Sequence, residues 1–213
     1  MPFSIDTFKS QLNFGGARPN LFVALLGGIT GVSVDFVAMC KSAQLPASEI
    51  GKVEVPYMGR KLPVRGDRTY SDLQLGFLND EDFAVRNFLE GWFEVMNTAK
   101  SNRQQTNNYH KTIYVAQFAK GGGSGSTVVD AIPIKVYEFK NCFPTNVSQI
   151  DLDWGTNDTI EEFTATFGYS HWLSNTTEQE GGVLGVLNNL ITGVSTIANA
   201  NQTFEGITKF FGR

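Results

Sequence analysis

The chain of 213 residues is 41% hydrophobic with a formal net charge of −4, which is enough apolar material for one substantial core. Only 18% of the residues are charged, against roughly 25% in ordinary soluble domains, and Asn, Thr and Ser supply much of the remaining polarity. No cluster pairs aromatic residues with Lys and Arg densely enough for a nucleic-acid reader, so that class is excluded. The composition favours β-structure, either in an ordinary monomer or in a protein whose surface is later covered by neighbours.

The charges are unevenly placed along the chain. Residues 41–70 hold six Lys and Arg against three Asp and Glu, whereas residues 150–180 hold seven acidic residues and no Lys or Arg. Two regions of opposite charge can attract each other across copies of the chain and fix the register of an assembly. Alternatively both regions are solvated faces, and these two interpretations stay open.

The two cysteines, Cys40 and Cys142, match no metal-binding or redox spacing. Both lie beside apolar segments, so we expect buried free thiols and no metal or other cofactor. The N-terminal segment lacks the apolar stretch of a signal peptide. We therefore expect a protein made in a reducing cytoplasm, without stable membrane binding.

The first elements in the chain are a short helix and two strands. Residues 4–13 are predicted to form the helix with Ser4 as its N-cap, and the glycines and proline of GGARPN end it. Apolar, β-branched runs at 21–26 and 32–39 are predicted to be strands.

Residues 51–66 are predicted to form a long β-hairpin with its tip at 59–61. Val53, Val55 and Tyr57 alternate on one face. Its two prolines each remove a ladder donor, which indicates an edge or a protrusion.

The end of this segment contains Arg65-Gly66-Asp67, the tripeptide that adhesive proteins present to integrin receptors. An adhesive tripeptide needs a protruding, flexible tip, whereas a strand-like alternation follows this one at 69–75. In a structural role, Gly66 permits a backbone conformation that a side chain would hinder. Asp67 then accepts hydrogen bonds from turn amides or pairs with Arg68.

The main helix is predicted over residues 79–97, with Asn79 as its N-cap and three acidic residues at the positive end of the helix dipole. An apolar stripe at helical spacing needs a sheet to cover. Its members are Val85, Phe88, Leu89, Trp92 and Met96. The polar residues 98–111 are predicted to be a loop.

Four further strands are predicted at 112–118, 128–139, 148–154 and 161–172. In the last of these, Phe163, Ala165, Phe167 and Tyr169 are expected to share one face. Glycine-rich 121–126 lacks a phosphate-loop ending and precedes a strand, which indicates a hairpin turn. The expected fold is mainly β, an antiparallel β-sandwich or split barrel with one packed α-helix, a long protruding hairpin and a helical C-terminal tail.

Residues 1–173 are expected to form this β-domain, and 174–213 an amphipathic tail that is too short and polar to span a membrane.

Catalytic and metal-binding chemistry finds little support. His110 and His171 are assigned structural roles. Residues 151–162 match an EF-hand loop at positions one, three and twelve, but lack its obligatory glycine and a flanking helix on the N-terminal side. We expect neither a calcium site nor an enzyme.

Several stretches taken together resemble the tail tube proteins of contractile-tailed bacteriophages. They occur in the order of that family over residues 1–172, whereas 98–111, the glycine-rich turn and the tail after 173 depart from it. The matching stretches are GGARPNLF (15–22), QLPAS (44–48), VPYMGRKLPVRGDRTYSD (55–72), NDEDFAVRNFLEGW (79–92) and FPTNVSQIDLDWGTNDTIEEFTATFGYSHW (143–172).

The resemblance implies a structural protein of the virion tail, assembled in the host cytoplasm. Six copies form a ring, rings stack into a tube, and DNA passes down the lumen after the surrounding sheath drives the tube through the host envelope. The implied partners are other copies of the chain and the sheath, baseplate and tail terminator proteins; DNA passes without sequence-specific binding. The implied fold is a β-sandwich whose strands join those of neighbours into a continuous barrel, with the helix on the outer side.

Two alternatives remain: a baseplate tube-initiator protein of the same fold, suggested by 174–213, and an enzyme of unrecognised type.

The resemblance also places the Arg-Gly-Asp tripeptide at the foot of the hairpin and rejects adhesion. A barrel closed across subunits removes exposed edge strands, and sixfold closure requires two different matching faces. The residues expected at assembly contacts are Arg18, Pro19, Asn20, Val53, Val55, Tyr57, Arg60, Lys61, Arg65, Asp67, Arg68, Asp151 and Asp153.

Overall fold

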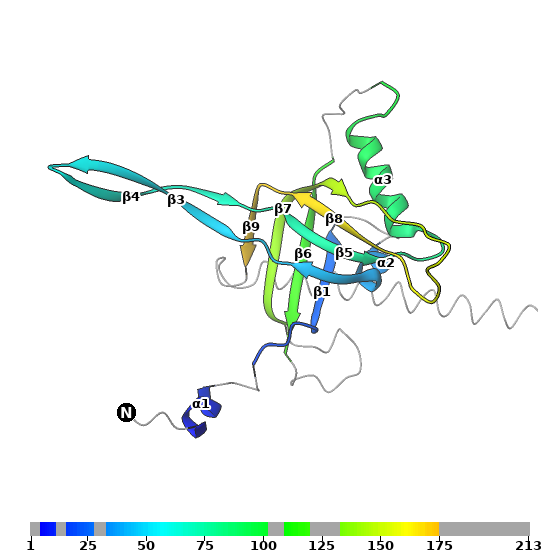
Figure 1. The fold of residues 1–213 in the computed structure, drawn as a ribbon, viewed down its shortest axis with the longest axis horizontal. Helices are drawn as coiled ribbons and strands as arrows, with labels where there is room; N and C mark the ends of the chain where they lie inside the picture. Colours follow the sequence, from blue (N-terminus) through cyan, green and yellow to red (C-terminus); the bar gives the residue numbers. More distant parts are fainter. Residues whose placement is uncertain (1–4, 12–15, 28–32, 102–108, 120–132, 175–213) are drawn as a thin grey trace, which may run out of the picture. The chain divides into compact units, whose positions relative to one another are not determined.

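The computed structural model describes residues 5–11, 16–27, 33–101, 109–119 and 133–174, and its fold is mainly antiparallel β, as predicted (Figure 1). The described residues fall into two compact units. The first comprises the described residues within 5–38, 111–140 and 172–174, and the second those within 39–110 and 141–171. Strand β7 (Pro133–Val147) contributes its first part to one unit and its last part to the other.

The first unit is built on a sheet in which β6 (Lys111–Phe118) pairs with β1 (Phe22–Gly27) on one side and neighbours β7 on the other. The short strand β9 (His171–Ser174) also pairs with β7. The core of this unit comprises Val23, Leu25, Tyr114, Ala116, Phe118 and Val136. The Tyr114 hydroxyl donates a 2.8 Å hydrogen bond to the buried carboxylate of Glu138, which also pairs with Lys140. The buried charge is thereby satisfied.

Two short helices accompany the first part of the chain. Helix α1 (Ile5–Gln11) confirms the central part of the helix predicted over 4–13, and its expected cap, Ser4, lies outside the described residues. Residues 32–39, predicted to be a strand, instead form helix α2 (Ser33–Met39). A buried apolar run of this length cannot be assigned by periodicity alone, and packing around the fully buried Phe36 overrides the β-preference of its neighbours.

The sheet of the second unit has the order β7, β8 (Glu162–Gly168), β5 (Leu73–Leu78) and β2 (Cys40–Gln44), all antiparallel. Alternate residues of β8 are buried, as predicted from the sequence: Phe163, Ala165 and Phe167. The predicted strand 161–172 is divided, because β8 ends at Gly168 and β9 begins at His171. Cys142 is buried and Cys40 half-buried, both as free thiols.

Helix α3 (Ala84–Met96) belongs to the second unit and buries Val85, Leu89 and Trp92. It begins five residues later than predicted. Asn79 does not cap it, because the cap residue is Phe83; the Asn79 side-chain amide instead donates to Glu161 Oε2 at 2.9 Å. The true cap residue, Phe83, has a left-handed backbone (φ 52°) and makes no side-chain cap bond.

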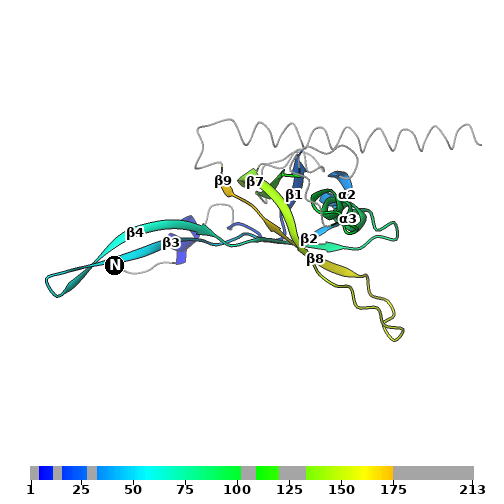
Figure 2. The same cartoon turned by 90° about the horizontal axis from the view of Figure 1, so that it is seen from above.

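The hairpin is confirmed and is longer than predicted. Strands β3 (Ser48–Tyr57) and β4 (Arg60–Tyr70) form a separate two-stranded sheet that projects beyond β2 and β5 (Figures 1 and 2). The turn is Met58-Gly59, both with positive φ, as a tight two-residue hairpin turn requires. The prediction that the tip comprises 59–61 is therefore wrong, because Arg60 and Lys61 belong to β4.

Residues 148–154, predicted to be a strand, lie in a loop between β7 and β8. All side chains from 151 to 160 are exposed, so the apolar alternation there has no neighbouring strand to pair with. This loop and the hairpin leave the second unit at opposite ends (Figure 2).

The predictions for 102–108, 121–126 and the C-terminal tail beyond 174 fall outside the described residues. Within the described part of the chain, no helix has the length and apolar character needed to cross a membrane.

Candidate assembly surface

One face of the β3–β4 hairpin is apolar. Residues directly opposite each other on antiparallel strands share a face, and the register places Val53 opposite Val64 and Val55 opposite Leu62. All four side chains are exposed. A contiguous exposed apolar patch of this kind marks an interaction site.

The other face of the hairpin is charged. Glu54 pairs with Lys61 at 2.9 Å and with Lys52 at 3.1 Å. These cations, Lys61 foremost, hold the pKa of the Glu54 carboxyl below its ordinary value. The pairs are exposed to solvent and contribute little to stability. Lys52 also lies opposite Arg65, so this face keeps an excess of positive charge.

The Arg65-Gly66-Asp67 tripeptide lies inside β4, at the foot of the hairpin. The register shifts at this point, between Ile50 and Lys52. A Cβ added to Gly66 would stand 3.0 Å from the carbonyl carbon and oxygen of Gly51. Glycine is therefore required by the close approach of the two strands, and the tripeptide is not at a flexible tip.

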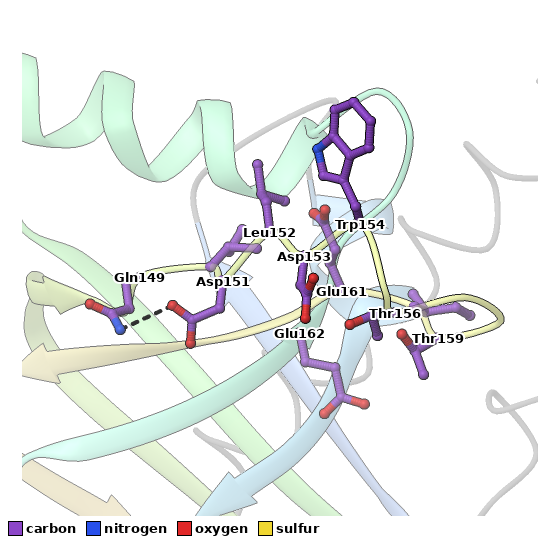
Figure 3. A pocket seen from close by; sticks show the side chains of 11 residues that line it. Gln149, Asp151, Leu152, Asp153, Trp154, Thr156, Thr159, Glu161 and Glu162 are labelled. Carbon is purple, nitrogen blue, oxygen red and sulfur yellow. Dashed lines mark hydrogen bonds between the residues drawn. The ribbon is translucent and has the colours of Figure 1, made fainter.

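The loop between β7 and β8 forms the second part of the surface. It borders an open hollow of about 460 Å³ (Figure 3). Asp151 accepts a hydrogen bond from the Gln149 amide at 3.2 Å. Asp153 accepts one from the Gly155 backbone N–H at 2.9 Å, which holds the turn at the top of the loop.

Apolar side chains stand exposed beside these carboxylates. Trp154 is 102% exposed, Leu152 80% and Ile160 68%, and Figure 3 shows the indole of Trp154 standing clear of the loop. Sequence reasoning singled out the two aspartates here and missed these apolar residues. The sequence does contain a signal for them, namely the alternation of apolar residues over 148–154, but this segment was assigned to a strand.

Two further carboxylates at the base of the loop already have partners. Glu161 accepts the Asn79 amide, and Glu162 pairs with Lys41. Asp151 and Asp153 form no ion pair with any residue that the structure describes. Their negative charge is available to a cation from outside the loop.

The structure separates the predicted assembly residues into three groups. Val53, Val55, Tyr57, Arg60, Lys61, Arg65, Asp67 and Arg68 share the hairpin, and Asp151 and Asp153 share the loop. Arg18, Pro19 and Asn20 lie in an exposed turn before β1, in the other unit. The Arg18 carbonyl accepts hydrogen bonds from Leu21 and Gln117 there.

Metal binding finds little support among the residues that the structure describes. No group of three or more His, Cys, Asp or Glu within the described ranges has the arrangement of a metal site. His110 is exposed, with its ring 4.0 Å from that of Tyr109, and His171 is exposed beside the Ser170 hydroxyl. The surface thus combines exposed apolar residues with charge, as a protein-binding surface does.

Comparisons with known proteins show the family to which the chain is similar. A family model described as phage tail tube protein matches residues 23–175. The tail tube protein gp19 of Enterobacteria phage T4 is 33% identical over 160 residues, covering 73% of this chain and 90% of the relative. The tail tube protein of Serratia phage KSP90 is 26% identical over 183 residues, covering 81% and 97%.

Solved structures share the fold at lower identity. A chain of the sheath–tube complex of an extracellular contractile injection system aligns with a TM-score of 0.52 at 15% identity, covering 80% of this chain and 97% of that one. A chain of the tube-terminating cap of the anti-feeding prophage aligns with a TM-score of 0.54 at 15% identity, covering 74% and 89%.

Proposed function

Because the chain belongs to the phage tail tube protein family, we propose that it is the structural subunit of the inner tube of a contractile phage tail. In this role, hexameric rings stack into a tube within the virion. The observation that carries the proposal is the family match over residues 23–175, which includes the hairpin, α3 and the acidic loop.

The hairpin is the assembly arm in this proposal. Its apolar face, with Val53, Val55 and Tyr57, is covered by a neighbouring subunit, which removes its exposed strand edges. The hairpin and the loop leave opposite ends of one unit, as a head-to-tail contact requires. The opposite charges of the basic hairpin and the acidic loop then set the register between copies. Arg18, Pro19 and Asn20 provide a further contact.

The proposal extends to the other parts of the tail. The sheath surrounds the tube, the baseplate and the terminator bind its two ends, and DNA passes through the lumen without sequence-specific contacts. In support, the fold is shared with chains of a sheath–tube complex and of a tube-terminating cap. We assign the chain no catalytic role.

A second candidate is a baseplate protein of the same fold that initiates the tube. It is favoured by the sequence beyond residue 175, which extends past the family match. Electron microscopy of the purified protein separates the candidates: long tubes support the tube subunit, and single rings that do not elongate support the initiator. A protein that stays monomeric at high concentration contradicts both.

A further inference from the structure

We propose that the hollow beside the β7–β8 loop is the receptor for the hairpin tip of a second copy of this chain. The inference rests on the proposed tube function and deepens it, because it names both sides of one contact between subunits. On the hairpin the contact residues are Tyr57, Met58 and Arg60, and in the hollow they are Asp151, Leu152 and Trp154.

The tip presents two large apolar side chains and one available cation. Tyr57 is 69% exposed and Met58 87% exposed. Arg60 lies directly opposite Tyr57, so the two share a face. Lys61 is already paired with Glu54, which leaves Arg60 as the cation next to the turn. The two-residue turn holds these groups on a short connection, which limits the conformational entropy lost on docking.

The hollow presents the complementary groups. Leu152 and Trp154 offer apolar surface, and Asp151 offers negative charge from the same stretch of chain. A volume of about 460 Å³ lies within the range of pockets that bury small ligands, and is therefore sufficient for side chains of the tip. Aromatic residues, Met and Arg are the types enriched at protein interfaces, and Tyr, Trp and Arg are the types that dominate binding energy.

The placement of the two elements favours a second copy as the occupant. The tip and the hollow lie at opposite ends of one unit, so each copy has a free tip at one end and a free hollow at the other. A contact of this kind is heterologous and continues from copy to copy. Net charge also agrees: the hairpin strands hold five basic and three acidic residues, whereas 148–162 holds five acidic residues and no basic one.

Charge reversal tests the contact. Arg60→Glu and Asp151→Lys should each weaken polymerisation at least about tenfold, measured as the concentration at which half the protein sediments as tubes. A chain carrying both changes restores opposite charges across the contact and should recover most of the loss.

Neutralisation gives a second test. Asp158→Asn is the matched control for Asp151→Asn, because Asp158 lies in the same loop but does not line the hollow. Only the Asp151 variant should shift the midpoint.

Tryptophan fluorescence reports on burial of the hollow in the wild-type chain. Of the three tryptophans, Trp92 is buried and Trp172 half-buried, whereas Trp154 is fully exposed. Docking of the tip should shift the tryptophan emission of the wild-type chain to the blue as tubes form. Arg60→Glu keeps all three tryptophans and should show no such shift under the same conditions.

The outcomes separate this contact from the tube function. If tubes form while Trp154 stays exposed and the reversed chains polymerise normally, the contact is wrong and the tube function stands. A shift without rescue by the double reversal means that a different segment or protein covers the hollow, which also overturns the contact. If the wild type never self-associates, both the contact and the tube function fail.

Discussion

The indole nitrogen of Trp92 donates a 2.7 Å hydrogen bond to the carbonyl oxygen of Tyr109. The bond links the middle of α3 to the residues just before β6. The same ring packs against Phe88 of its own helix, with centroids 5.7 Å apart, and against Phe167 of β8 at 6.2 Å. Trp92 therefore joins helix, sheet and loop within the second unit.

Two different replacements of Trp92 should lower the free energy of unfolding by different amounts. Trp92→Ala removes a buried aromatic ring and should lower the free energy of unfolding by roughly 3–5 kcal/mol. Trp92→Phe keeps much of the packing but leaves the Tyr109 carbonyl unpaired, at roughly 1–3 kcal/mol. Urea unfolding measures both. Trp154→Ala, at a fully exposed site, is the control and should stay within about 0.5 kcal/mol of wild type. Equal midpoints for Trp92→Ala and wild type would show that the stripe is not packed.

Adding one methyl group at Gly66 should disturb the hairpin. The new Cβ would meet the Gly51 carbonyl group at 3.0 Å, so the strands must separate at their foot. We expect Gly66→Ala to speed hydrogen exchange in β3 and β4 and to impair tube formation. Gly91→Ala is the control: it is exposed in α3 with no atom within 4 Å of its new Cβ, and should stabilise by about 0.5–1 kcal/mol. Unchanged exchange in Gly66→Ala would contradict the close approach.

Charges on the apolar face of the hairpin should block polymerisation without unfolding the chain. In Val55→Asp with Tyr57→Asp, two carboxylates would be desolvated when a neighbour covers this face. We expect a folded monomer by circular dichroism and gel filtration, and no tubes by electron microscopy. Pro56→Asp adds charge to the opposite face of the same strand and should still assemble. Normal tubes from the double variant would contradict a role of this face in assembly.

The thiol of Cys40 should resist ionisation in the folded chain. Burial raises its pKa from 9.0 to about 12. Above about pH 9 the unfolded thiol loses its proton while the folded one keeps it. This contribution to stability is therefore present below pH 9 and is lost as the pH rises towards 12. Urea unfolding at about pH 8 and about pH 10.5 should show a larger loss for wild type than for Cys40→Ser; equal losses would contradict the shift.

Local patterns in the sequence predicted the elements whose partners are set by simple alternation. The buried series Phe163, Ala165 and Phe167 and the hairpin were both predicted correctly, because a strand with one buried face alternates its side chains. Residues 148–154 show a similar alternation but form a loop, since no strand pairs with them. Periodicity records which side chains share a face and does not record whether a partner strand is available.

The start of α3 depended on a contact between distant residues, and the hollow depended on which apolar side chains stay exposed. Asn79 fits the capping pattern, yet its amide bonds to Glu161, 82 residues away. The hollow brings the exposed apolar residues Leu152 and Ile160 together with Asp151. In the sequence, exposed and buried apolar residues look the same, so only the charged part of this surface could be predicted.

The final prediction concerns Asp67, in β4 beside the Gly51–Gly66 approach. Its side chain is exposed in the single chain, so Asp67→Ala should change the unfolding of the monomer by less than about 1 kcal/mol. If a neighbouring subunit buries and pairs this carboxylate in the ring, its loss should weaken assembly by roughly 3–5 kcal/mol. Asp158→Asn is the comparison, because Asp158 is exposed with a left-handed backbone (φ 63°) that Asn tolerates. Sedimentation should show a clear assembly defect for Asp67→Ala and little change for Asp158→Asn. Equal assembly of the two variants would place Asp67 outside the contacts between subunits.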